Sequence, residues 1–246
     1  MLTFNHFKTL GLAAAATLAL APTANAFTLH GPLTAQEFED RNVEEAMSPE
    51  SRWGDGGLTS ATHEVNIHNG ANTATFDESN FLWENGGVVD FSVVFDGINT
   101  LTYTVGDTVL ETTSVERDFS DLYLRTTARL NGSSIVLQNL TFDNGGASES
   151  VSDVSSVCTS PTNCGFFDAS YFHIGDIDGA FELTGQSIMS WDENIDPPKN
   201  SRLAYQVKLV YGEETVDVPE PGMVLGLAGL AVGAIARRKK NDAPVA

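Results

Sequence analysis

The sequence LYLRTTARLNGSSIVLQNLTF, residues 122 to 142, decides the fold class. Its first half alternates with a period of two residues, which indicates a β-strand with one buried face. The residues sharing that face are Leu122, Leu124, Thr126, Ala128 and Leu130. Asn131-Gly132 suits a type I′ turn, so the stretch predicts a β-hairpin whose second strand runs from Ser133 to Phe142.

The same period recurs on both sides of this stretch. We expect about ten short strands, with Asn144 to Ser156 as a long exposed loop rich in Ser, Gly and acidic residues. The other strands expected are His63–His68, Val88–Phe95, Leu101–Val105, Thr108–Thr113, Tyr171–Ile174, Phe181–Thr184, Ser187–Trp191 and Leu203–Tyr211. Many short strands with little helix predict an all-β fold, an antiparallel β-sandwich with a jelly-roll-like arrangement.

One short helix is expected near the start of this region. Thr34 and Glu37 have the spacing of a capping box, and Leu33 with Phe38 has that of a hydrophobic staple. The helix is predicted from Ala35 to Met47, with Ser48-Pro49 ending it.

The N-terminus has the pattern of a secretory signal peptide. Lys8 precedes an apolar run from Leu10 to Leu20, and Ala24-Asn25-Ala26 has the small residues of a cleavage site. We therefore expect residues 1–26 to be removed by signal peptidase, which leaves residues 27–217 as one exported domain.

The C-terminus joins three unlike pieces in a fixed order. Pro219-Glu220-Pro221 is a stiff joint, the run from Met223 to Ala236 is uncharged and apolar, and the basic residues Arg237 and Arg238 open a cationic tail. The segment from 218 to 246 resembles the PEP-CTERM sorting signal of bacterial surface proteins. Under this resemblance the apolar run is a transmembrane helix.

The resemblance implies a route and a setting. An exosortase-type enzyme would recognise the signal and remove the tail, so the membrane anchor is transient. The destination is then the cell surface or an extracellular matrix that contains polysaccharide, where we expect a structural or binding role. A permanent single-span anchor is the competing interpretation of the tail.

Charge and cysteine content agree with export. The chain has 13 basic and 33 acidic residues, a net charge of −20, which excludes nucleic acid as a partner. Cys158 and Cys164 are expected to form a small disulfide loop in an oxidising compartment, because a zinc site would need more ligands nearby than His173.

No catalytic motif appears, and we expect a protein that is not an enzyme. Asp176 and Asp178, followed by Gly179, resemble the start of a calcium loop, and Glu182 could contribute to a loop that is not an EF-hand; an Asp-Gly turn explains the same residues. Trp53 and Trp191 lie in polar contexts where an aromatic ring can stack on a sugar or simply pack. A calcium-dependent carbohydrate-binding module is therefore the first alternative, and a glycan-acting hydrolase with paired carboxylates is the second.

Overall fold

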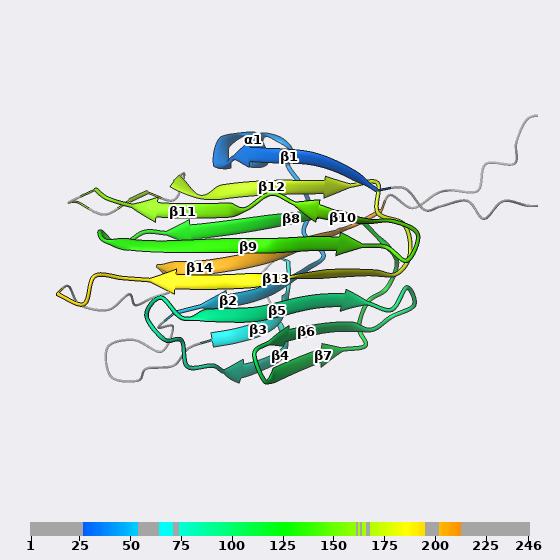
Figure 1. Cartoon of the computed structure of the whole chain (residues 1–246). Coiled ribbons are helices and arrows are strands. Elements are labelled where there is room, and N and C mark those ends of the chain that lie inside the picture. The colour runs from blue at the N-terminus through cyan, green and yellow to red at the C-terminus, as the bar shows by residue number, and fades with distance from the viewer. Residues whose placement is uncertain are drawn as a thin grey trace, which may run out of the picture. The chain divides into compact units, whose positions relative to one another are not determined.

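The computed structural model describes residues 27–53, 64–70, 74–160, 162, 164–165, 168–194 and 202–212. They form two antiparallel β-sheets packed face to face (Figure 1). The predicted all-β sandwich is confirmed at this level. The signal peptide and the C-terminal helix lie outside the described residues. Within the described residues, no helix is long and apolar enough to cross a membrane.

Sheet A carries seven strands. In spatial order they are β1 (Thr28–Thr34), β12 (Ser170–Gly175), β8 (Phe119–Ala128), β14 (Leu203–Tyr211), β2 (Met47–Arg52), β3 (Glu64–Asn69) and β4 (Thr75–Asn80). The most regular apolar alternation, in β14, thus lies at the centre of this sheet. Both neighbours of β14 are antiparallel to it.

Sheet B also carries seven strands. In spatial order six of them are β10 (Ser148–Val151), β9 (Ser133–Asp143), β13 (Phe181–Ser190), β5 (Val88–Phe95), β6 (Leu101–Val105) and β7 (Thr108–Thr112). The seventh, β11 (Val154–Cys158), pairs with the first half of β9, on the same edge as β10. The prediction that the run from Val88 to Phe95 is a central strand is confirmed, because β5 lies between β13 and β6.

The core lies between the inner faces of the sheets. Leu122 and Val207 of sheet A, and Val93 and Leu183 of sheet B, are completely buried. Full burial of such a side chain contributes about 1.5–3 kcal/mol. A polar contact also spans the core, since the hydroxyls of Ser51 and Tyr103 lie 2.7 Å apart.

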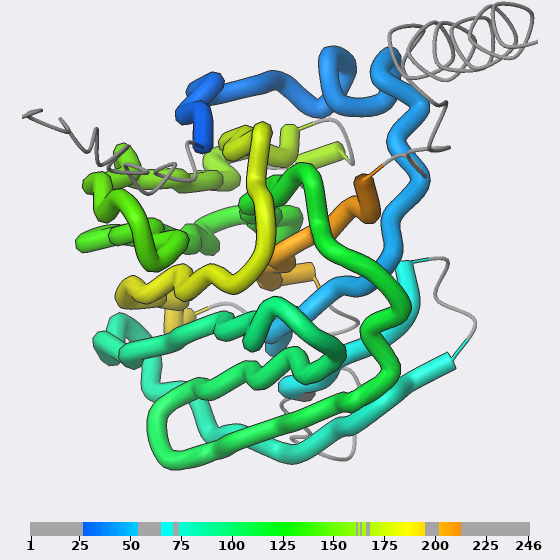
Figure 2. Tube along the Cα trace, turned by 90° about the vertical axis from the view of Figure 1, so that its right-hand side faces the viewer, coloured from blue at the N-terminus to red at the C-terminus, as the bar shows by residue number. Residues whose placement is uncertain are grey.

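The helix α1 (Ala35–Asp40) is shorter than predicted. The capping box between Thr34 and Glu37 is confirmed. The predicted extension to Met47 is wrong, because Met47 begins β2 and pairs with Leu209. Arg41 and Asn42 instead form a turn, and residues 43–46 lead from it to β2, which Figure 2 shows as the blue tube descending along the side of the molecule.

The hairpin predicted around Asn131-Gly132 is wrong, although the turn exists. The Ser133 amide donates to the Leu130 carbonyl at 3.0 Å, and Gly132 has a φ of 77°. Asn131 is not among the residues with positive φ, which a type I′ turn requires. The two strands separate into different sheets: β8 pairs with β12 and β14, and β9 pairs with β13. The turn is an arch across the core.

Two other predictions are corrected by pairing. The stretch from Asn144 to Ser156 is largely strand, because β10 and β11 add end to end along one edge of β9. The two strands expected between Phe181 and Trp191 are one strand, β13. Backbone pairing with a long neighbour outweighs the polar composition of these segments.

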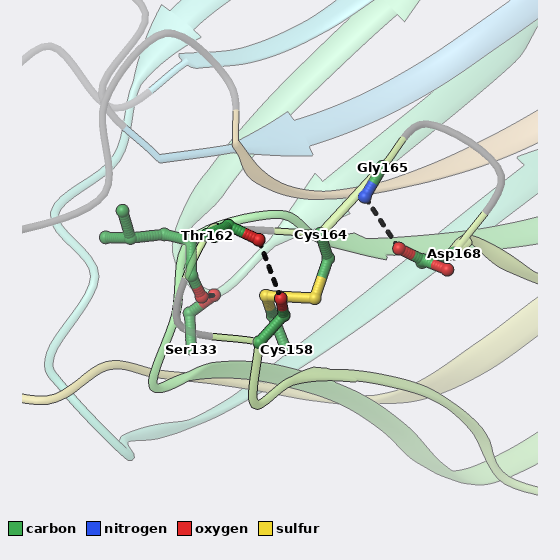
Figure 3. The surroundings of a disulfide bond; sticks show 8 residues. Ser133, Cys158, Thr162, Cys164, Gly165 and Asp168 are labelled. Carbon is green, nitrogen blue, oxygen red and sulfur yellow. Dashed lines mark hydrogen bonds between the residues drawn. A yellow bond between two sulfur atoms is a disulfide. The ribbon is translucent and has the colours of Figure 1, made fainter.

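The predicted disulfide is confirmed. Cys158 ends β11, and its sulfur bonds to that of Cys164 with the Cα atoms 5.7 Å apart (Figure 3). The Cys164 amide donates to the Arg129 carbonyl at 3.2 Å, and the Gly132 amide donates to the Cys158 carbonyl at 2.8 Å. The bridge therefore fastens the place where the chain leaves sheet B for sheet A.

Candidate functional site

A row of polar side chains crosses the outer face of sheet A. In the strand register Glu50 of β2 lies opposite Asn66 of β3 on one side and Gln206 of β14 on the other. Gln206 in turn lies opposite Arg125 of β8, and the Arg125 guanidinium donates to the Gln206 side chain at 2.8 Å. Because strand side chains alternate, all four point away from the core.

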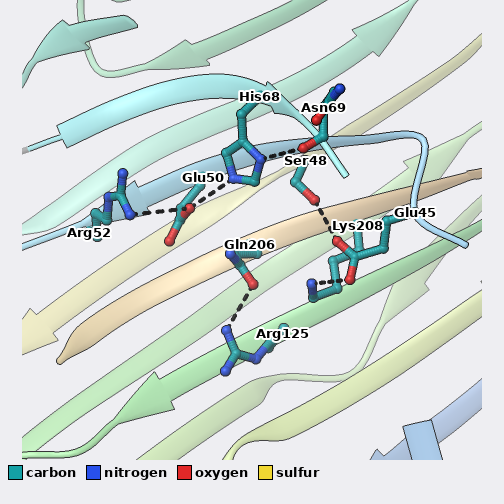
Figure 4. A network of polar contacts seen from close by, with 9 residues as sticks. All are labelled: Glu45, Ser48, Glu50, Arg52, His68, Asn69, Arg125, Gln206 and Lys208. Carbon is teal, nitrogen blue, oxygen red and sulfur yellow. Dashed lines mark hydrogen bonds and ion pairs between the residues drawn. The ribbon is translucent and has the colours of Figure 1, made fainter. Parts of the chain in front are cut away.

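Part of this row forms the wall of a cleft of about 350 Å³. Its described lining consists of Glu50, Arg52, Asn66, His68, Ala74, Thr75 and Gln206. The polar side chains are deeply set, since Asn66 is 1% exposed and Glu50 and His68 are each 5% exposed. Figure 4 shows Glu50, Arg52 and His68 converging from β2 and β3.

The Glu50 carboxylate has its partners within the cleft. The Glu50 carboxylate lies 3.0 Å from His68 Nε2 and 3.9 Å from Arg52 Nη1. Burial raises the pKa of Glu50, but the hydrogen bond from His68 and the charge of Arg52 outweigh it and leave the pKa below its usual value. His68 Nδ1 lies 2.8 Å from the Asn69 carbonyl, so both ring nitrogens face acceptors when Glu50 is ionised.

Another part of the outer face is covered by the chain itself. Phe38 of α1 packs on the rings of Tyr123 and Tyr171. Beyond the helix, Glu45 accepts hydrogen bonds from Lys208 and, at 3.0 Å, from the Ser48 hydroxyl (Figure 4). Burial lowers the pKa of Lys208, and Glu45 offsets part of that shift. The cleft is therefore the part of this face that segment 35–46 leaves open.

The structure brings Trp53 and Trp191 together. Their ring centroids are 4.2 Å apart, both rings are half-buried, and both pack against the core. Asn85 supports the pair by donating to the Trp191 carbonyl at 2.9 Å. Neither tryptophan lines the cleft, although Trp53 directly follows Arg52, so their role in ligand binding stays a prediction.

Two of the calcium candidates, Asp176 and Asp178, lie in the connection from β12 to β13, and Glu182 is the second residue of β13. Asp176 has a φ of 57° and Gly179 one of 70°, which fits a tight turn. Glu182 lies on the outer face of sheet B. Within the described residues, no group of three or more His, Cys, Asp or Glu side chains that could hold a metal ion is found. The calcium prediction therefore gains no support from geometry.

The residues of the cleft were not predicted as site residues from the sequence. Glu50 directly follows Ser48-Pro49, where a helix end was expected, and Gln206 lies within the strand expected from Leu203 to Tyr211. The available signal was the repeated polar position on β2, β3 and β14, but the sequence does not show that these strands are neighbours. His68 lies in the strand expected from His63 to His68, and its ring contacts the Glu50 carboxylate and the Asn69 carbonyl.

The described residues thus define an all-β sandwich domain with a polar cleft on one sheet. Beyond that domain, residues 217–240 match the family model of the PEP-CTERM protein-sorting motif. The match contains the predicted sorting residues Pro219, Glu220, Pro221, Arg237 and Arg238. The motif marks the chain for export, membrane-associated sorting and processing by an exosortase-type enzyme. A comparison with curated proteins found no match.

Proposed function

We propose that this exported protein acts at the cell surface or in the extracellular matrix by binding carbohydrate in the cleft of sheet A. The observation that carries the proposal is the cleft wall. Hydrogen-bonding side chains from β2, β3 and β14 converge there and are fixed by their neighbours, as a preorganised site requires.

The lining favours an uncharged, hydroxyl-rich ligand. Glu50 already has His68 and Arg52 as partners, so an anionic ligand would compete with Glu50 for them and a cation would compete with them for Glu50. The amides of Asn66 and Gln206 and the hydroxyl of Thr75 both donate and accept hydrogen bonds, as sugar hydroxyls do. A polysaccharide therefore matches the cleft better than a phosphate, a metal ion or a nucleic acid.

The protein is proposed to bind without catalysis. A glycoside hydrolase needs two carboxyl groups about 5–10 Å apart across its cleft. Glu50 is the single carboxylate among the described lining residues, and His68 and Arg52 hold it ionised. The hydrolase alternative would require a second carboxylate at this site, and the calcium-dependent alternative would require binding to stop when EDTA removes the ion.

The test is calorimetric titration of the full chain with dextran, a β-1,3-glucan, a β-1,4-mannan and the polyanion alginate. Ala74 is exposed on the cleft rim, so Ala74→Trp should fill the cleft without touching the Glu50 contacts. We expect a neutral polysaccharide to bind and Ala74→Trp to weaken that binding at least about tenfold. The control is Ser134→Trp, on the outer face of sheet B and outside the cleft.

Unchanged binding by Ala74→Trp would remove the cleft from consideration. Loss of binding in EDTA would favour the calcium-dependent alternative, and the appearance of shortened oligosaccharides would favour the hydrolase.

A further inference from the structure

A second hollow lies on the outer face of sheet B, on the opposite side of the sandwich from the cleft. It measures about 460 Å³. Its floor includes Ser92 of β5, Thr104 of β6 and Thr184 of β13. The register places Ser92 opposite both Thr104 and Thr184. Three hydroxyls therefore stand in a row across neighbouring strands, about 4.8 Å from one strand to the next.

An amide relay borders this row. Gln186 accepts a hydrogen bond from the Asn139 side chain at 2.8 Å and donates one to Asp90 at 2.9 Å. The relay thus joins β9, β13 and β5, and it fixes the direction in which each amide presents its remaining atoms. Asn139 reaches this position because β9 bulges there, with a φ of 52° at Asn139.

The chemistry of the hollow disfavours anionic ligands. Its described lining has two carboxylates, Asp90 and Glu182, and no basic side chain, so it repels anions. A metal ion is disfavoured as well, because the described residues hold no group of three potential metal ligands. Hydroxyl and amide groups spread over several strands suit an extended chain of sugar rings.

We infer that this hollow is a second polysaccharide site, and that the domain cross-links polysaccharide chains by holding one on each face of the sandwich. The inference rests on the proposed carbohydrate binding at the sheet A cleft. Two sites that point in opposite directions cannot easily grip one stiff chain, so they favour bridges between chains over tighter binding to one. Such bridging would give the protein a structural role in a matrix.

The test compares three single substitutions in the full chain. Ala74→Trp blocks the cleft, Thr184→Trp blocks the hollow, and Ser134→Trp is the matched control on the outer face of sheet B outside the hollow. The probe is the neutral polysaccharide that binds most strongly among dextran, β-1,3-glucan and β-1,4-mannan. Calorimetry measures the number of sites per chain, and light scattering measures cross-linked particles.

We expect two sites per chain in the unmodified protein and in Ser134→Trp, with growth of large particles. Thr184→Trp should retain one site and lose at least about tenfold in scattering, because one site per chain cannot bridge. Ala74→Trp should behave in the same way.

A single site abolished by Ala74→Trp and untouched by Thr184→Trp would overturn the inference while the proposed function stands. A single site abolished by Thr184→Trp alone would overturn the assignment of the cleft and the bridging together. Absence of binding to every neutral polysaccharide would overturn both proposals.

Discussion

The side chains of Asp121 and His173 meet on the outer face of sheet A, where Asp121 Oδ1 and His173 Nε2 lie 2.7 Å apart. The hydrogen bond from His173 lowers the pKa of Asp121 against the opposing effect of burial, and the Ser120 hydroxyl adds a second bond at 2.6 Å. The other groups facing this pair are His30, Arg41 and Tyr123. The contact therefore joins β8 to β12 through an ionised carboxylate.

Replacing the Asp121 carboxylate should make the free energy of unfolding less dependent on pH in the acidic range. A carboxyl group with a lowered pKa stabilises the fold above its ordinary pKa of 3.8, and that contribution is lost as the pH falls through the lower folded value. Asp121→Asn should thus reduce the free energy of unfolding by about 1–2 kcal/mol at pH 7, with a much smaller difference at pH 2. Urea unfolding at both pH values measures this.

The control for that comparison is Asp118→Asn, at an exposed carboxylate three positions earlier in the chain. It should leave the free energy of unfolding nearly unchanged at both pH values. An equal loss for Asp121→Asn at pH 7 and pH 2 would show that the packing of the side chain matters there, and not its charge.

Single residues were predictable where their partners are close in sequence. The capping box of Thr34 with Glu37 and the disulfide of Cys158 with Cys164 could be predicted because only a few residues separate the members of each pair. The pairing of Glu50 with His68 depends on β2 and β3 becoming neighbours, and Gln206 joins them only because β14 enters the sheet beside β2. No local pattern contains that information.

At the scale of strands, the β9 bulge determines which side chains enter the core. Ile135 and Leu137 are buried before the bulge, and Leu140 and Phe142 are buried after it, so the alternation shifts by one residue. Asn139 is the extra residue at the bulge, and its backbone has a φ of 52°. Without the extra residue, the second half of β9 would turn its apolar side chains outward.

Asn139→Val should therefore lower the free energy of unfolding by about 1–3 kcal/mol, because a β-branched side chain is strained at positive φ. Asn139→Gly keeps the backbone freedom and loses only the amide contact with Gln186, so it should cost less than about 1 kcal/mol. Chemical unfolding of the two variants separates backbone from side chain. Equal losses would assign the effect to the amide contact.

The pairing of whole strands also explains why the hairpin prediction was wrong. The apolar alternation of β8 and β9 fits a hairpin within one sheet and an arch between two sheets equally well, since both bury every second residue. The turn at Asn131-Gly132 is common to both arrangements. Only long-range pairing, of β8 with β14 and of β9 with β13, separates them. The strands β5, β6, β7 and β14 were predictable because they carry their pattern locally.

The whole molecule combines an acidic sandwich with a sorting motif that lies outside it in the sequence. The chain carries a net charge of −20, yet basic residues close its C-terminal segment. Nothing in the sandwich requires that arrangement, and the matched motif at 217–240 accounts for it. A change in the motif should therefore alter sorting without altering ligand binding, and a change in the sandwich should alter binding without altering sorting.

Replacing Pro219-Glu220-Pro221 with three alanines should leave the protein in the membrane fraction with its C-terminus intact, because the exosortase-type enzyme no longer recognises the motif. The unmodified chain should lose its C-terminal segment, which intact mass measurement of both fractions detects.

Asn241→Ala, just beyond the matched residues, is the control and should be processed normally. If the triple-alanine chain were trimmed like the unmodified one, recognition would have to reside in the apolar run or the basic tail. Polysaccharide binding by the retained chain should be unchanged, because the cleft and the hollow are built from residues before 212.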